Sequence, residues 1–153
     1  MKLKYLIIHC TYTHPSLRLT KRHILDWHLA KWDRAGYSDL ILRDGTLHNI
    51  TPFNQDNEVD SSEITWGVKG INGIARHLCL EGGQDQDGQS ASPLRVFPDM
   101  EKPLKKYIEY TILRHPGIKI AGHYQFDIKK PFCPGFNVPE FCEGFIDENN
   151  IHR

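Results

Sequence analysis

Two short apolar runs near opposite ends of the chain each lead to a histidine, and this feature constrains the fold most. Residues 3–8 precede His9, and residues 118–121 precede Gly122 and His123. Short runs of aliphatic and β-branched residues are typical of strands buried in a sheet. If the two strands are neighbours, we expect both imidazoles to lie at the same edge of that sheet.

A cysteine follows the second histidine on a stiffened loop. Pro131 and Pro134 flank the pair Phe132-Cys133, and proline restricts the backbone around the thiol. Imidazole nitrogen and thiolate sulfur both bind zinc, and three protein ligands with an open fourth position are typical of a catalytic zinc site. Spacing alone also allows the other interpretation, in which His9 is a structural residue at the end of a buried strand.

Further strands and helices alternate between these two runs. Thr20 is placed to cap a helix that ends near Asp33, and Asp99 to cap a second helix. Residues 43–46 contain Asp-Gly and indicate a hairpin. Other strands are expected at residues 39–42, 47–50 and 74–80, and a last short helix at residues 139–146. This order predicts a single domain, residues 1–153, of the α/β class, with a central mixed β-sheet flanked by helices.

Composition excludes several classes of function. Lys plus Arg and Asp plus Glu number 19 each, so no field of one sign favours nucleic acid or an anionic membrane surface. The apolar run at residues 5–8 is too short for a signal peptide or a membrane span, which predicts synthesis in the cytoplasm. We expect a monomer without membrane insertion, in which Cys10, Cys79 and Cys142 are buried and reduced.

Seven short segments across most of the chain form a pattern by their order and spacing. They are LIIHCT (6–11), ILDWH (24–28), AGY (35–37), LRDG (42–45), VKGIN (68–72), LCLEGG (78–83) and the stretch from GH to CPGF (122–136). Together they resemble the zinc-dependent N-acetylmuramoyl-L-alanine amidases of the phage-lysozyme and peptidoglycan-recognition-protein type, called amidase type 2.

The resemblance implies a metal centre and a substrate. Zinc would be bound by His9, His123 and Cys133 in a peptidoglycan-recognition-protein-like fold. The activity would be hydrolysis of the amide between the lactyl group of N-acetylmuramic acid and L-alanine in peptidoglycan. Zinc would lower the pKa of a bound water and polarise the carbonyl of this poor electrophile.

Two further residues resemble catalytic positions of the family. Tyr37 follows a Gly turn, and its phenol would orient the water or assist proton transfer, although it could also simply pack at a strand start. Lys130 would place its ammonium near the developing oxyanion, and we prefer it to Lys129 because it is nearer Cys133. The alternative for both lysines is a solvated pair.

Two residues are candidates for contacts with the substrate. Trp66 offers a flat face to a sugar or peptide, and Asn72 offers both a donor and an acceptor. A place in the core is the alternative for Trp66. The chain departs from the family at three nearby positions, where Ser38 and Gly67 replace histidines and Pro131 replaces a lysine.

Three other functions remain open at this point. They are a non-catalytic peptidoglycan-binding module on the same fold, a zinc amidase acting on soluble muropeptides, and a structural domain in which Cys133 forms a disulfide. A signal-less amidase would suit a phage or prophage endolysin, a bacteriolytic enzyme that reaches the cell wall after release. It would equally suit a recycling enzyme or an exported toxin.

Overall fold

A five-stranded mixed sheet forms the centre of the molecule in the computed structural model, which describes residues 1–153. In chain order the strands are β1 (Tyr5–Cys10), β2 (Asp39–Ile41), β3 (Leu47–Asn49), β4 (Ala75–Leu80) and β5 (Lys119–Gly122). They lie side by side in the order β3-β2-β4-β1-β5, and only β3 runs antiparallel to its neighbour. The predicted fold class is therefore confirmed.

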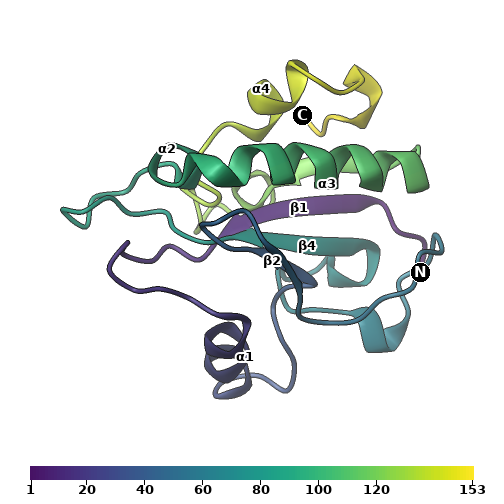
Figure 1. Cartoon of the computed structure of the whole chain (residues 1–153). Helices are drawn as coiled ribbons and strands as arrows, with labels where there is room; N and C mark the ends of the chain where they lie inside the picture. The colour runs from purple at the N-terminus through teal and green to yellow at the C-terminus, as the bar shows by residue number, and fades with distance from the viewer.

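Helices cover both faces of the sheet (Figure 1). Helix α1 (Lys21–Leu29) lies on one face, and α3 (Glu101–Arg114) lies on the other, with α4 (Val138–Glu143) beside it. A short helix α2 (Pro93–Val96), which the sequence did not predict, precedes α3. No helix is both long and apolar enough to span a bilayer.

Successive side chains of the buried strands point to opposite faces of the sheet, so the hydrophobic core has a part on each face. Leu6 and Ile8 of β1 pack with Leu104 and Ile108 of α3, in the larger hydrophobic cluster. Ile7 belongs to a separate cluster on the opposite face. Because successive side chains of a strand point to opposite faces, His9 shares the face of Ile7 and α1.

Two predicted helix boundaries were wrong. Helix α1 begins after its Thr20 cap as predicted, but it ends at Leu29 rather than near Asp33, because the amides of the next turn bond back to the carbonyl of His28. Asp99 does not cap α3: it lies in a 3-10 turn, and Met100 precedes the helix without a side-chain cap.

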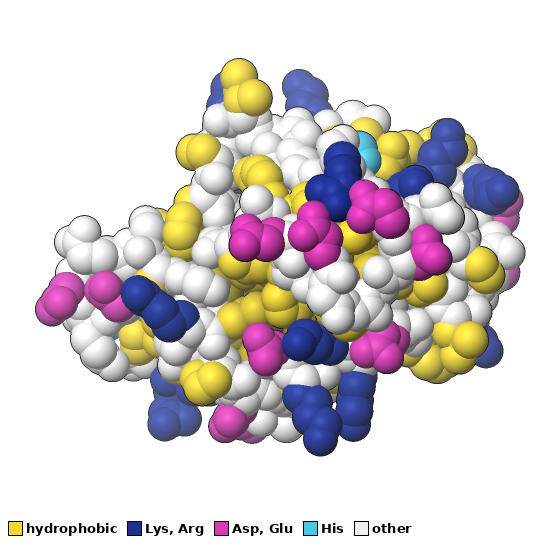
Figure 2. All heavy atoms as spheres, turned by 90° about the horizontal axis from the view of Figure 1, so that it is seen from above, with side chains coloured by type: hydrophobic (Ala, Val, Ile, Leu, Met, Phe, Trp, Pro, Cys, Tyr) yellow, Lys and Arg dark blue, Asp and Glu magenta, His cyan; other side chains and the backbone are white.

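The cysteines, and the charges on the face that carries α3 and α4, agree with the composition. All four cysteines are free, and Cys10, Cys79 and Cys142 are buried as expected. Seen from the side of α3 and α4, acidic and basic side chains alternate across the surface without a large region of one sign (Figure 2).

Candidate metal centre

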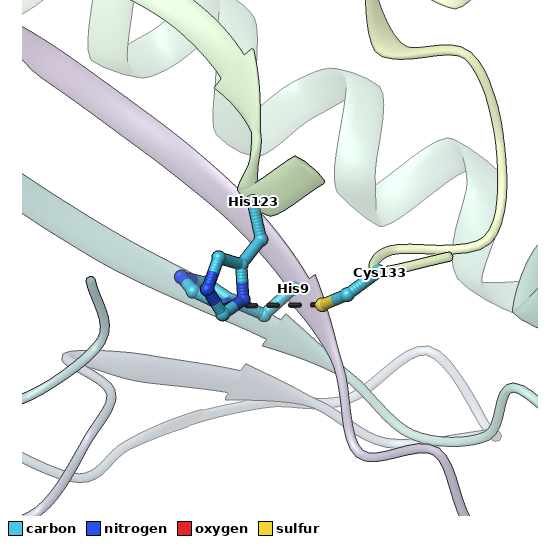
Figure 3. Close-up of side chains that lie close together, drawn as sticks. All are labelled: His9, His123 and Cys133. Atoms are coloured by element: carbon cyan, nitrogen blue, oxygen red, sulfur yellow. Dashed lines mark hydrogen bonds between the residues drawn. The ribbon is translucent and has the colours of Figure 1, made fainter. Parts of the chain in front are cut away.

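Three side chains converge at the carboxyl ends of strands β1 and β5 (Figure 3). The Nδ1 atoms of His9 and His123 are 3.0 Å apart, and the sulfur of Cys133 is 4.0 Å from Nδ1 of His9. One ligand atom from each of the three residues lies within 4.8 Å of the others. The sequence prediction that these three residues come together is matched by their positions, and their role as ligands stays a prediction.

The sheet brings the two histidines together. Strands β1 and β5 are parallel neighbours, and Ile8 pairs with Gly122, so that His9 and His123 follow at adjacent strand ends. The loop after His123 then returns to the same place, where the amide of Tyr124 donates to the carbonyl of Cys133 at 3.0 Å. The amide of Cys10 donates to the sulfur of Cys133 at 3.3 Å, which fixes the thiol beside β1.

Burial and hydrogen bonding set the charge of these groups. Burial lowers the pKa of His9, which keeps its imidazole neutral. Hydrogen bonding, first from the Cys10 thiol and then from His123, lowers the pKa of Cys133 well below its usual value, against the opposing effect of burial. Neutral imidazole and thiolate are the forms that bind metal ions, because each offers a free electron pair.

The donor set fits a zinc ion. Tetrahedral Zn²⁺ with bonds of about 2.0 to 2.3 Å holds its ligand atoms about 3.3 to 3.8 Å apart. The spacing of the three ligand atoms needs only side-chain adjustments of a fraction of an ångström to a little over one ångström to reach that range. Three protein ligands beside an open cleft leave one position for solvent or substrate.

A third histidine, which the sequence analysis did not single out, lies behind the first. Nε2 of His9 is 2.9 Å from Nδ1 of His77, and Nε2 of His77 is 3.0 Å from Oδ1 of Asn72. His77 is fully buried on β4. The available signal was a histidine inside a strand that is otherwise apolar after Arg76, because a buried polar group needs a partner.

A cleft of about 890 Å³ opens over the three side chains. All three tryptophans of the chain, Trp27, Trp32 and Trp66, contribute to its lining. The remaining predicted site residues also line it, namely Tyr37, Asn72, Lys129 and Lys130. The cleft therefore combines flat aromatic surfaces with lysine side chains next to the candidate metal ligands.

Tyr37 lies beside two of the histidines. Its ring centroid is 5.2 Å from that of His9 and 5.0 Å from that of His28. Burial raises the pKa of Tyr37 well above its usual value, so the phenol keeps its proton. It is thus a hydrogen-bond donor in the neutral pH range.

The two lysines come from one exposed turn. The amide of Lys129 donates to the carboxylate of Asp127 at 2.9 Å, and the amide of Lys130 donates to the carbonyl of Asp127 at 3.0 Å. The same carboxylate lies 3.7 Å from Nε2 of His123. This turn therefore ties the lysines to the strand end that carries His123.

The two predicted substrate residues differ in how they face the cleft. Trp66 is 38% exposed, and its indole nitrogen donates to Asp33 at 2.7 Å, so the ring is held at the cleft wall rather than in the core. Asn72 directs its carbonyl oxygen inward, to the amide of Val68 and to His77. A direct contact of either residue with substrate stays a prediction.

Comparisons of sequence identify relatives among phage proteins. No family model matches the sequence. Endolysins of Enterobacteria phage T3 and Escherichia phage T7 are each 27% identical to this chain over 141 residues, covering 90% of the chain and 84% of the phage protein.

Comparisons of structure extend the likeness to amidases and recognition proteins. The N-acetylmuramoyl-L-alanine amidase LysC from Clostridium intestinale superposes with a TM-score of 0.69 at 22% identity, over 94% of this chain and 85% of LysC. Drosophila PGRP-LB, solved in complex with tracheal cytotoxin, superposes with a TM-score of 0.70 at 19% identity, over 100% of this chain and 86% of its own. These structures share the fold, and with the phage relatives they show that the chain is similar to type 2 N-acetylmuramoyl-L-alanine amidases and peptidoglycan recognition proteins.

Proposed function

We propose that this protein is a zinc-dependent N-acetylmuramoyl-L-alanine amidase that cleaves peptidoglycan. The observation that carries the proposal is the convergence of His9, His123 and Cys133 at the open end of an aromatic cleft. The comparisons support it, since the chain is similar to phage endolysins and to a solved N-acetylmuramoyl-L-alanine amidase. The bond hydrolysed would be the amide between the lactyl group of N-acetylmuramic acid and L-alanine.

The residues of the chain would divide the work at this bond. Zn²⁺, when bound by His9, His123 and Cys133, supplies a Lewis acid that acidifies water and polarises a carbonyl. The protonated phenol of Tyr37, beside His9, would donate a hydrogen bond that orients the attacking water or the scissile group.

The exposed lysine turn would act on charge that develops during attack. Lys130, in the cleft lining, would direct its ammonium at the oxyanion, where a fixed positive charge stabilises the transition state more than the ground state. Lys129 lines the same cleft and is the alternative for this role. The tryptophan faces would hold glycan or peptide on either side of the bond.

We further propose that residues 1–153 act as one catalytic domain and as a monomer. The likeness to phage endolysins supports the cell wall as the site of action, reached after release or export from the cytoplasm. The glycan strand with its stem peptide would be the macromolecular partner, consistent with the structural likeness to a recognition protein bound to tracheal cytotoxin.

Metal analysis combined with product analysis tests the proposal. We expect one Zn²⁺ per chain, and release of new amino groups on L-alanine from purified sacculi without new reducing ends. Chelation should stop the reaction and added Zn²⁺ should restore it. A zinc-loaded protein that binds sacculi but releases no amino groups would instead be a recognition module. Cleavage of soluble muropeptides alone would assign it to recycling.

A further inference from the structure

His77 contacts the side of His9 that faces away from the other candidate ligands. Nδ1 of His9 is directed at His123 and Cys133, whereas Nε2 of His9 is 2.9 Å from Nδ1 of His77. His77 has no exposed surface, and His9 is 1% exposed. No water can therefore compete for the contact between the two rings.

A series of hydrogen bonds runs from the Val68 amide through Asn72 and His77 to His9. The direction of each bond follows from the backbone amide at its start. The N–H of Val68 can only donate, so Oδ1 of Asn72, 2.8 Å away, is an acceptor. The same oxygen lies 3.0 Å from Nε2 of His77, which must then carry the proton. Nδ1 of neutral His77 is left with a lone pair.

That lone pair determines the tautomer of the candidate ligand. Nδ1 of His77 accepts, so Nε2 of His9 must donate and carry the proton of its ring. Nδ1 of His9 is consequently unprotonated, and its lone pair points to the place where His123 and Cys133 meet. The opposite direction of bonding would put a proton on the atom that has to bind the metal.

The backbone leaves room for this histidine at one specific position. A Cβ atom added to Gly67 would lie 2.3 Å from Nδ1 of His77, a distance that no side chain can tolerate. The ring of His77 therefore lies directly against the main chain at Gly67. On the other side, the pairing of Ile7 with His77 in the sheet fixes the ring behind β1.

We propose that Asn72 and His77 are positioning residues, which hold His9 in the tautomer and orientation that a metal ion needs. The proposal rests on the proposed function, since it assigns to His9 the role of a zinc ligand. Supporting contacts of this kind usually change metal affinity by about 10- to 100-fold. Neither residue needs to touch the substrate.

Nitrogen-15 NMR of the histidine side chains reads the tautomers directly, in the metal-free protein and after addition of Zn²⁺. We expect protons on Nε2 of both His9 and His77. His115 is an internal control, because Arg76 can only donate to its Nε2, which places the proton of His115 on Nδ1, toward Asn57. A proton on Nδ1 of His77 in the metal-free protein would overturn the proposal.

The zinc affinity of substituted proteins tests the same series of hydrogen bonds in a second way. His77→Phe removes the acceptor and keeps the ring, and we expect about 10- to 100-fold weaker Zn²⁺ binding in competition with a chromophoric chelator. His77→Asn should recover most of this loss, because its amide oxygen can take the place of Nδ1. His115→Phe is the matched control, a buried histidine on the other face of the sheet whose loss should leave affinity unchanged.

The outcomes separate this inference from the proposed function. Wild-type affinity in folded His77→Phe overturns the positioning role and leaves the amidase proposal intact. A zinc-loaded wild-type protein without amidase activity overturns the function, whereas the tautomers and affinities still decide the inference. If His77→Phe does not fold, the tautomers in the wild-type protein and the affinity of His77→Asn decide it.

Discussion

The two faces of the sheet bury polar side chains in different ways, although the same strand supplies both. On the α3 face, Arg76 of β4 donates to the carbonyl of Asn54 at 2.9 Å and lies 3.3 Å from His115. On that face too, the phenol of Tyr107 donates to Asp39 at 2.5 Å. Donors there meet acceptors within the protein, and only Nε of Arg76 has no partner.

The α1 face, one residue further along β4, is different. His77 there leads to His9, and Nδ1 of His9 faces Nδ1 of His123 at 3.0 Å. With the tautomers inferred above, His9 brings a lone pair rather than a proton to this contact, and the thiolate of Cys133 adds negative charge.

This difference indicates which polar cluster is structural and which is functional. The cluster on the α3 face is nearly complete and should contribute to stability. The cluster on the α1 face gathers electron pairs that a cation would satisfy, and it opens to a cleft. Substitutions on the two faces should therefore change different quantities, and the following predictions test that separation.

The largest expected effect is the loss of metal and activity in Cys133→Ser. Removal of a direct ligand should weaken Zn²⁺ binding by more than the about 100-fold that a supporting contact contributes, and should abolish amide hydrolysis with it. The metal-free protein should stay folded, because the site is partly open and the serine hydroxyl can still accept from the amide of Cys10. Chelator competition, turbidity loss of sacculi and denaturant unfolding measure the three quantities.

Cys142→Ala is the control for this substitution. It also removes a thiol, but from the fully buried cluster under α4. It should lower stability and leave Zn²⁺ affinity unchanged. Full zinc affinity and turnover in Cys133→Ser would show that the ligand assignment is wrong.

Tyr37→Phe should separate metal binding from chemistry. The phenol is protonated and lies beside His9, so its loss should leave Zn²⁺ binding intact and lower kcat by about 100-fold or more. Tyr12→Phe is the matched control in the same cleft, because its hydroxyl bonds to Ser90 instead. A packing role for Tyr37 would appear as a change in stability with little change in kcat.

The sequence predicted only some of the residues in the polar cluster on the α1 face. His9, His123 and Cys133 could be found because each stands at a strand end or on a proline-stiffened loop, and because zinc uses few residue types. The sequence does not single out His77, because residues 74–80 have the pattern of one buried strand. Nothing in that pattern distinguishes a histidine that has a hydrogen-bond partner from one that has none. The partner of His77 on β1 depends on which strands are neighbours and in what register, and local sequence does not determine either.

The fold itself was more predictable than its details. Strand positions and the mixed sheet followed from apolar runs and turn residues, which depend on local sequence. The early end of α1 was missed because the apolar spacing continues to Trp32, whereas the amides of Lys31 and Trp32 both bond back to the carbonyl of His28. Similarly, no local signal could show that Asn72 directs its carbonyl inward, since its two donors come from a turn and from β4.

Acid should lower the free energy of unfolding of the protein through His28, which lines the cleft. Burial, and then the charge of Lys31, lowers the pKa of His28 to about 4 in the folded protein, below the value of about 6.5 in an unfolded chain. Between these values the unfolded state binds more protons, so the free energy of unfolding falls as pH drops from about 6.5 toward 4. The contribution at pH 5 should be about 2 kcal/mol.

His28→Asn keeps an acceptor for the Gly36 amide and removes the titration. Denaturant unfolding of the metal-free protein at pH 7 and pH 5 should show a smaller loss in this variant than in the wild type. His23→Asn, at a half-buried histidine of the same helix, is the control, and its amide oxygen can still accept from the Thr20 amide. An identical loss in wild type and His28→Asn would assign the pH dependence to other groups.

The smallest expected effect is on the α3 face, where Tyr107→Phe should lower stability and nothing else. Burial raises the pKa of Asp39, while the hydrogen bond from Tyr107 acts in the opposite direction, so the phenol stabilises the charged carboxylate. Its loss should cost about 1.5 kcal/mol in the free energy of unfolding. Zn²⁺ affinity and kcat should stay at wild-type values. Leu40 packs on the α1 face, so its neighbour Asp39 points to the opposite face, away from the cleft.

Tyr110→Phe, at an exposed position of the same helix, should change neither stability nor Zn²⁺ affinity. A loss of zinc in Tyr107→Phe would mean that the two faces are coupled through β4, and that the polar cluster under α3 helps to hold His77 as well.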